Sequence, residues 1–330
     1  MRRYIKIILI GIWAMILFSG NVMAAKKVLI VPGLSEEEIK SVTTYEPFFK
    51  GIEAVLSREK IVPEYLYVGL DESSDDAARD TLGKEAVLKI KAINPDVVIA
   101  VNDNVVKYVA MQVENIPVVA GFFFGAPEAL GLPTANITGV ARRSFAVDIW
   151  AMAKQISGAN TVSMLSKNSF SMAQIKTGLF AKVDVLEKMS GVRLKEMYLC
   201  DTFDEWKKHV ENWTEDLIYL ADVSRIKNAD KEVPASELVQ WTVANAKVPV
   251  VGANEEAAKD GALFVIVTSE EKWGEQVGTM VLKTLSGTPV KDIPMETVMK
   301  GKLLINAKTA IDKKIEIPYE ILNSADHIYE

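Results

Sequence analysis

Asn94-Pro-Asp-Val-Val-Ile-Ala-Val101 is the stretch of this 330-residue chain that decides the fold. Five apolar residues end it, and no polar residue interrupts them. A strand that is apolar at every position is buried on both faces, which is typical of parallel sheets covered by helices. In front of it, apolar residues recur at spacings of three and four, as on one face of a helix: Leu82, Ala86, Ile90 and Ile93. Asn94 ends this helix because a residue before proline avoids the helical region.

The same alternation of strand and helix extends in both directions. In the first half, further strands are expected at residues 27–31, 65–68 and 116–120, with a helix over 46–56. The pattern restarts in the second half, with strands at 161–165, 192–199, 216–220 and 248–251 and helices over 171–189, 203–213 and 236–246. Two β-α-β series in succession predict an α/β protein with two doubly wound, Rossmann-like lobes.

The amino-terminal residues have the features of an export signal. Basic residues come first, residues 7–18 are almost continuously apolar, and Val22-Met-Ala24 supplies residues suited to a cleavage site. This pattern predicts a signal peptide over residues 1–24, cleaved between Ala24 and Ala25. The apolar run is shorter than the roughly 20 residues of a spanning helix, which favours cleavage over a membrane anchor. No cysteine follows the run, so we expect a periplasmic product without a lipid anchor.

Composition limits the partners of the mature chain. Removing 24 residues from 330 leaves 306, enough for two ordinary domains. The formal net charge of the full chain is −6, and removing Arg2, Arg3 and Lys6 with the signal makes it −9, which gives no reason to expect a nucleic-acid partner. No later apolar run approaches a membrane span, so no membrane insertion is expected after signal cleavage. Cys200 is the only cysteine, and we expect a buried small hydrophobe there rather than a reactive thiol.

Catalytic signatures are missing from the sequence. It contains no G-x-S-x-G, G-x-G-x-x-G or Walker motif. His209 and His327 are the only histidines, which leaves little material for a metal site or a catalytic triad. We therefore expect no enzyme, no metal and no cofactor. A hydrolase with paired carboxylates stays open, although the acidic clusters are also typical of solvated helix starts.

Several fragments together resemble a known family. In the carboxyl-terminal part these are Val248-Pro-Val-Val-Gly-Ala-Asn254, Lys259-Asp-Gly-Ala-Leu263, Gly274-Glu-Gln-Val-Gly278, Leu303-Leu-Ile-Asn-Ala-Lys-Thr-Ala310 and Ile317-Pro-Tyr-Glu-Ile-Leu-Asn-Ser-Ala-Asp326. Earlier fragments are Asn94-Pro-Asp, Ile116-Pro-Val-Val and Asn136-Ile-Thr-Gly-Val140. Their order resembles the ABC-transporter substrate-binding proteins whose relatives include tryptophan-binding lipoproteins. Two loops depart from the family pattern, at Asn102-Asp103 and at Phe122-Phe-Phe-Gly-Ala-Pro127, so the ligand is expected to differ.

The resemblance implies a type I periplasmic-binding fold, with two lobes joined by three crossovers and a ligand between them. We expect lobe one to comprise residues 25–141 with about 269–297, and lobe two residues 142–268 with about 298–330. Ligands of open parallel sheets bind beyond the carboxyl ends of the strands, so two facing lobes place these ends on the walls of a cleft. Hinge closure would then bury the ligand.

Residues after the expected strands are the candidate ligand contacts. In lobe one they are Ser35, Asn102, Asp103, Phe122 and Phe123. In lobe two they are Ser166, Ser169, Asp222 and Asn254, with Trp273 at the returning crossover. Alternate side chains of an extended segment face opposite ways, so at most one or two of Phe122, Phe123 and Phe124 can line the cleft.

Each polar candidate has a second interpretation. Asp222 and Asp103 can bind a ligand ammonium through a charge-assisted hydrogen bond or cap the next turn. Ser166 and Ser169 can donate to a carboxylate beside a helix start or serve as the cap of that helix. Trp273 can stack on the ligand or pack between helices.

These observations predict a periplasmic solute-binding protein that delivers a small ligand to the permease of an ABC importer. The ligand expected is an amino acid or a similar zwitterion, with aromatic ones among the candidates. Two alternatives stay open. The protein can present its ligand to a sensory system, or it can be an exported α/β enzyme, which turnover of a ligand would reveal.

Overall fold

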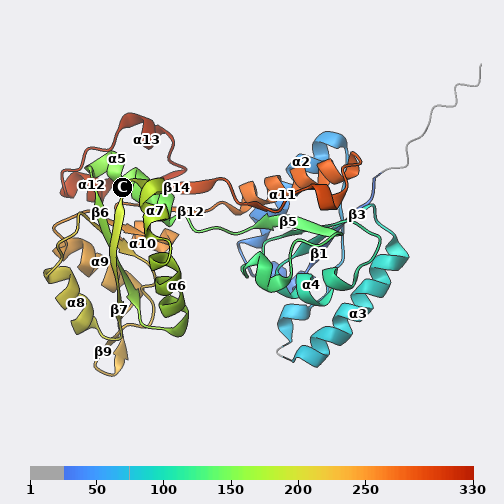
Figure 1. Cartoon of the computed structure of the whole chain (residues 1–330), viewed down its shortest axis with the longest axis horizontal. Helices are drawn as coiled ribbons and strands as arrows, with labels where there is room; N and C mark the ends of the chain where they lie inside the picture. Colours follow the sequence, from blue (N-terminus) through green and yellow to red (C-terminus); the bar gives the residue numbers. More distant parts are fainter. Residues whose placement is uncertain (1–25, 74) are drawn as a thin grey trace, which may run out of the picture.

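The computed structural model describes residues 26–73 and 75–330. The predicted signal peptide lies outside these residues. Within the described part of the chain, no helix is long and apolar enough to cross a membrane. Figure 1 shows two lobes joined by crossing segments of chain.

Lobe one is built on a six-stranded sheet of order β13-β5-β4-β3-β1-β2, and all its strand pairs are parallel. Its strands are β1 (Val28–Pro32), β2 (Glu64–Tyr65), β3 (Val97–Val101), β4 (Val118–Gly121), β5 (Ile137–Ala141) and β13 (Glu296–Thr297). Its helices are α1 (Glu36–Ile39), α2 (Tyr45–Leu56), α3 (Asp76–Ile93), α4 (Asp103–Tyr108) and α11 (Glu270–Leu285).

Lobe two is built on a seven-stranded sheet of order β15-β14-β12-β11-β8-β6-β7, in which β12 and β14 form the one antiparallel pair among the described strands, so β14 and β15 both run opposite to the other five. Its strands are β6 (Thr161–Lys167), β7 (Arg193–Cys200), β8 (Leu217–Leu220), β11 (Val250–Gly252), β12 (Phe264–Thr268), β14 (Gly301–Asn306) and β15 (His327–Tyr329). Its helices are α5 (Ala146–Ser157), α6 (Phe170–Phe180), α7 (Val183–Ser190), α8 (Phe203–Glu211), α9 (Ala235–Asn245), α10 (Glu255–Lys259), α12 (Ala307–Asp312) and α13 (Tyr319–Asn323). A small ribbon joins β9 (Lys227–Asn228) to β10 (Lys231–Glu232).

The two sheets share one topology. In lobe one, β2 lies on one side of β1, and β3, β4 and β5 follow on the other side. In lobe two, β7 lies on one side of β6, and β8, β11 and β12 follow on the other side. Strand order therefore reverses between β1 and β3 in lobe one and between β6 and β8 in lobe two, the places where open α/β sheets usually bind ligands. This arrangement confirms the predicted α/β fold class.

The chain passes between the lobes three times. Residues 142–145 join β5 to α5, Ser269 joins β12 to α11, and residues 298–300 join β13 to β14. Helix α11 and strand β13 therefore belong to lobe one, although they follow most of lobe two in the sequence (Figure 1). The domain boundaries given above stay our proposal.

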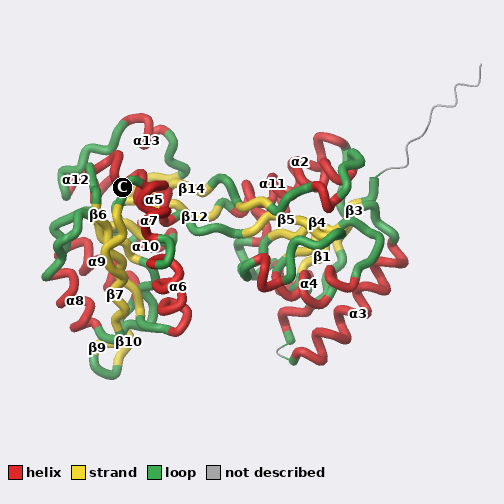
Figure 2. Tube along the Cα trace, viewed as in Figure 1, coloured by secondary structure: helices red, strands yellow, loops and turns green. Residues whose placement is uncertain are grey.

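Apolar side chains fill both faces of the sheet in lobe one. Val28 and Ile30 of β1 belong to one buried cluster, and Leu29 and Val31 belong to another. Helices flank the strands in both lobes (Figure 2). Helix α11 packs directly on α2, and a Cβ at Gly274 would overlap the Phe48 carbonyl. Glycine is therefore required there by close approach.

One predicted helix, over residues 171–189, is wrong. The segment forms two helices, α6 and α7, separated at Ala181 and Lys182. The interruption lets the two parts use different surroundings. Both helices contact β7, but α7 also packs on α5, whereas α6 has no buried residue. Cys200, by contrast, is fully buried as predicted, and burial raises the pKa of its thiol to about 12.

Candidate functional site

A cavity of about 800 Å³ lies between the two lobes. Residues after β4 and β5 line it on the side of lobe one, and residues at the ends of β8, β11 and β12 line it on the side of lobe two. Its volume is in the range of small-molecule sites, which are concave and mostly apolar. Five carboxyl-terminal strand ends thus converge on one space.

The wall from lobe one is aromatic. The ring of Phe122 is stacked on Trp273, with centroids 5.3 Å apart, and Phe124 meets both rings edge-on. Trp273 is 1% exposed, and its Nε1 donates to the Val140 carbonyl at 2.9 Å. Phe124 is 58% exposed, so it offers a free ring face to the cavity. Tyr45 and Phe48 support the Phe122 ring from behind.

The wall from lobe two is apolar and includes one face of α6. Met172, Ile175 and Leu179 line the cavity at helical spacing. Since α6 has no buried residue, this apolar face lies open to the cavity. Tyr219 of β8 completes the wall, packed edge-on against Trp150. Burial raises the pKa of Tyr219 above its ordinary value, so its hydroxyl stays neutral.

Most charged groups of the lining are already paired. Lys302 lies 3.1 Å from Glu270, and Glu255 accepts a hydrogen bond from the Tyr329 hydroxyl at 3.2 Å. Arg143 forms two hydrogen bonds with Asp148, at 2.7 and 3.1 Å.

Arg142 is the exception. Among the described residues it has no ion pair or side-chain hydrogen bond, and its guanidinium carbon lies 5.4 Å from the centroid of the Phe124 ring. The cavity therefore combines an aromatic wall with one uncompensated cation, a combination that suits a ligand with a carboxylate and a planar apolar part.

Three of the ten predicted contacts line this cavity: Phe122, Asn254 and Trp273. Asn254 also caps α10, because its Oδ1 accepts from the Ala257 amide at 2.9 Å. Phe123 packs in a different core cluster of lobe one from Phe122 and is 0% exposed. The expected alternation of this aromatic run is thus observed, with Phe122 and Phe124 facing the cavity.

The three polar candidates of lobe one lie outside the lining. Ser35 caps α1, and its backbone amide donates to Glu72 at 2.7 Å. Asn102 caps α4 and donates to Asp71, and Asp103 accepts from the amides of Phe124 and Gly125 at 2.9 and 2.7 Å.

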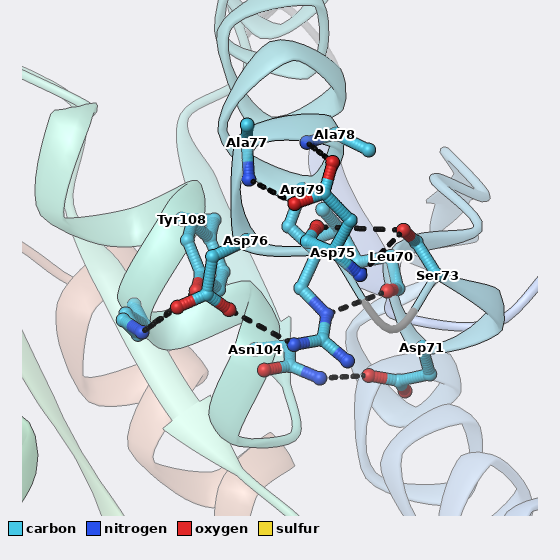
Figure 3. Close-up of polar contacts among 11 residues, drawn as sticks. Leu70, Asp71, Ser73, Asp75, Asp76, Ala77, Ala78, Arg79, Asn104 and Tyr108 are labelled. Carbon is cyan, nitrogen blue, oxygen red and sulfur yellow. Dashed lines mark hydrogen bonds and ion pairs between the residues drawn. The ribbon is translucent and has the colours of Figure 1, made fainter.

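Asp71 connects this region to α4. Asn104 donates to Asp71 at 2.6 Å, and Arg79 holds the same loop through the Leu70 carbonyl at 3.3 Å (Figure 3). Where the strand order of lobe one reverses, the polar side chains therefore already bind one another through hydrogen bonds.

The other three polar candidates of lobe two, Ser166, Ser169 and Asp222, lie outside the lining. Ser169 caps α6 by accepting from the Met172 amide at 3.2 Å. Ser166 is fully buried, and its Oγ has no hydrogen-bond partner in the described structure. Asp222 accepts from the amide and the hydroxyl of Ser224 and lies 3.3 Å from Lys167. Whether any of these residues binds ligand stays a prediction.

The pKa of the Asp222 carboxyl group is lowered in the folded protein. Burial opposes its ionisation, but the hydrogen bonds from Ser224 and the ion pair with Lys167 outweigh burial and hold the pKa below the ordinary 3.8. When folding lowers the pKa of a carboxyl group, the group stabilises the folded state at pH values above its pKa in the unfolded chain. This stabilisation is lost as the pH falls through its pKa in the folded protein. The arrangement favours the capping alternative over an ammonium contact.

Replacing Asp222 with asparagine is therefore expected to lower stability at pH 7 by up to about 1 kcal/mol, because the pair with Lys167 is partly exposed. The difference from the unmodified protein should shrink as the pH falls through 3.8 and further into the acid range, because the pKa of Asp222 in the folded state lies below that value. The affinity for an amine-bearing ligand should stay unchanged. Urea unfolding at pH 7 and over an acid pH series, together with calorimetric titration, tests this. A loss of affinity without a loss of stability would support the ammonium contact instead.

Sequence reasoning missed Arg142 and the face of α6. Arg142 directly follows β5, so the rule of strand ends applies to it as well. The α6 face had a signal in the spacing of Met172, Ile175 and Leu179. That spacing marks an apolar face without saying what covers it.

Comparison with known proteins gives a consistent result. A family model described as ABC transporter substrate binding protein matches residues 71–329. A tyrosine-binding protein of Clostridioides difficile strain R20291 is 27% identical over 93 residues, which are 28% of this chain and only 27% of that protein's length.

Two solved structures share the fold. The ligand-free, open structure of a substrate binding protein with adhesive properties from Clostridium difficile is 17% identical, with a TM-score of 0.68 over 92% of this chain and 99% of that one. The ABC domain in complex with L-Trp from Streptococcus pneumonia is 19% identical, with a TM-score of 0.53 over 92% and 100%. The architecture is thus a type I periplasmic-binding fold.

Proposed function

Because the chain belongs to the family of ABC transporter substrate-binding proteins, we propose that it binds an amino acid between its lobes and delivers it to an ABC importer. It acts in the periplasm, after removal of residues 1–24, and by binding rather than catalysis. The observation that carries the proposal is the unpaired Arg142 beside an aromatic wall, inside a cavity bounded by both lobes.

The chemistry of the cavity matches an aromatic amino acid. The Arg142 guanidinium provides a planar donor for the ligand carboxylate, and the exposed ring of Phe124 provides a face for stacking. The apolar face of α6 would cover the opposite side of the ligand. L-tryptophan and L-tyrosine are therefore the first ligands to try, and the names of the similar proteins support this choice.

Binding is expected to close the lobes. A ligand that contacts both walls stabilises the arrangement in which the walls approach, and the three crossovers act as the hinge. Residues 142–145 and the segment around Ser269 absorb the backbone change while each lobe moves as a rigid body. Closure would give the permease a shape that distinguishes loaded from empty protein.

The test combines ligand screening with small-angle scattering. L-tryptophan at 100 times its Kd should stabilise the protein by roughly 2.7 kcal/mol, and the radius of gyration should fall on binding. D-ribose serves as the control and should change neither. If no amino acid stabilises the protein, the proposed ligand class is wrong. If a ligand binds and the scattering curve stays the same, the closure mechanism is wrong. Chemical conversion of a bound ligand would indicate an enzyme instead.

A further inference from the structure

Arg143 connects two of the three crossovers. It lies in the first crossover, and its guanidinium reaches the third, where Nε donates to the Val298 carbonyl at 2.7 Å and Nη2 to the Met299 carbonyl at 3.3 Å. Another edge of the same guanidinium, formed by Nη1 and Nη2, donates to both carboxylate oxygens of Asp148 in α5. Hydrogen bonds from a charged planar donor are stronger and more directional than neutral ones. The third crossover is thus anchored to lobe two through one side chain.

The residues held by Arg143 are the ones that must move. Val298 and Met299 lie between β13 in lobe one and β14 in lobe two, so any change in the angle between the lobes alters their backbone torsions. Met299 is also held from lobe one, because its amide donates to Gln276 of α11 at 3.3 Å. The peptide groups around Met299 therefore link a helix of lobe one to an arginine fixed on lobe two.

We propose that the lobes of this structure are in the open arrangement, and that Arg143 and Asp148 form a clasp that holds the third crossover in it and so limits ligand affinity. Closure must strain or break the hydrogen bonds to Val298 and Met299. A clasp that stabilises the open state lowers the population of the closed state, and the apparent Kd rises in proportion. Arg143 is thus a positioning residue for binding, although it also borders the cavity beside Arg142. The affinity part of this proposal rests on the proposed function, whereas the part on lobe geometry does not.

The deciding variant is Asp148→Asn, because Asp148 does not line the cavity. It leaves Arg143 in place but removes the charge that orients the guanidinium. Arg143→Met removes the clasp altogether. Arg142→Met is the matched control, since it changes the neighbouring arginine, which has no partner on the crossovers in the described structure.

The first readout is the distance between lobes in the ligand-free, full-length protein. Spin labels are attached at Lys89→Cys on α3 and Lys208→Cys on α8, both exposed. Native Cys200 is buried with a raised thiol pKa and should not react. Asp148→Asn and Arg143→Met should shift the distance distribution toward the closed arrangement, whereas Arg142→Met should keep the parent distribution. An unchanged distribution in both clasp variants would refute the clasp.

The second readout is calorimetric titration with L-tryptophan. Both clasp variants should bind about fivefold more tightly than the parent, at the lower end of typical coupling between sites, and Arg142→Met should bind more weakly. Weaker binding by Asp148→Asn, or a lower melting temperature with unchanged distance and affinity, would show a merely structural role and overturn the proposal. If the parent protein does not bind L-tryptophan, the aromatic-ligand proposal fails, and the distance measurement still decides on the clasp.

Discussion

Replacing Arg142 with glutamine is expected to weaken the binding of L-tryptophan by about 10- to 100-fold. A hydrogen bond to a charged group contributes about 1.5–3 kcal/mol, and each 1.4 kcal/mol is a factor of ten. Glutamine keeps a donor near the ligand carboxylate but removes the charge and the two parallel N–H groups. Isothermal titration calorimetry at physiological salt measures the change.

The Arg142→Gln variant should lose ligand affinity without losing folding stability. Arg142 has no ion-pair or hydrogen-bond partner among the described residues and its guanidinium lies over the exposed Phe124 ring, so the unfolding midpoint of Arg142→Gln should stay near that of the parent. Arg142→Lys keeps the charge without the planar fork and should lose less affinity than glutamine. Equal affinity for the parent and both variants would remove Arg142 from the site and leave the carboxylate without its proposed partner.

Replacing Trp273 with alanine is expected to destabilise the protein by about 3–5 kcal/mol. The side chain is 1% exposed, stacks on Phe122 and donates its Nε1 hydrogen to the Val140 carbonyl. Alanine leaves a cavity between α11 and the sheet and an unsatisfied carbonyl at the end of β5. Urea unfolding followed by circular dichroism measures the loss.

Two further measurements make the Trp273 prediction specific. Trp273→Phe keeps an aromatic ring but loses the hydrogen bond, so it should cost less than alanine. Ligand affinity of Trp273→Ala should also fall, because Phe122 loses the ring that supports it from α11. A destabilisation below about 1 kcal/mol would mean that the aromatic wall is not held by this residue.

The strands could be predicted because their signal is local. The continuously apolar run of β3 and the restart of the pattern at β6 depend on neighbouring residues alone, and both strands are observed. The resemblance also identified the family correctly. The interruption between α6 and α7 was missed because neither Ala181 nor Lys182 breaks helices by type.

The candidate site was harder to predict, because the rule that ligands bind beyond the carboxyl ends of strands does not say which strand ends take part. Asn102 and Asp222 follow strands as expected, but each is engaged by a residue distant in sequence or by its own loop. The partner of Asn102 is Asp71, 31 positions earlier, and no spacing announces such a pair. Arg142 stands out for the opposite reason, since only the three-dimensional structure shows that it has no ion-pair or hydrogen-bond partner among residues 26–73 and 75–330.

The threefold passage of the chain between the lobes also dictates the order in which the molecule can fold. Lobe one needs α11 and β13, which emerge only after residues 146–268 have been made. An amino-terminal fragment ending in β12 would leave the apolar surface of α2 bare, since α11 is what packs on it. Lobe two can assemble its parallel strands from β6 to β12 without interruption. Contacts of such long sequence separation form slowly, so lobe one stays incomplete until nearly the whole polypeptide is present.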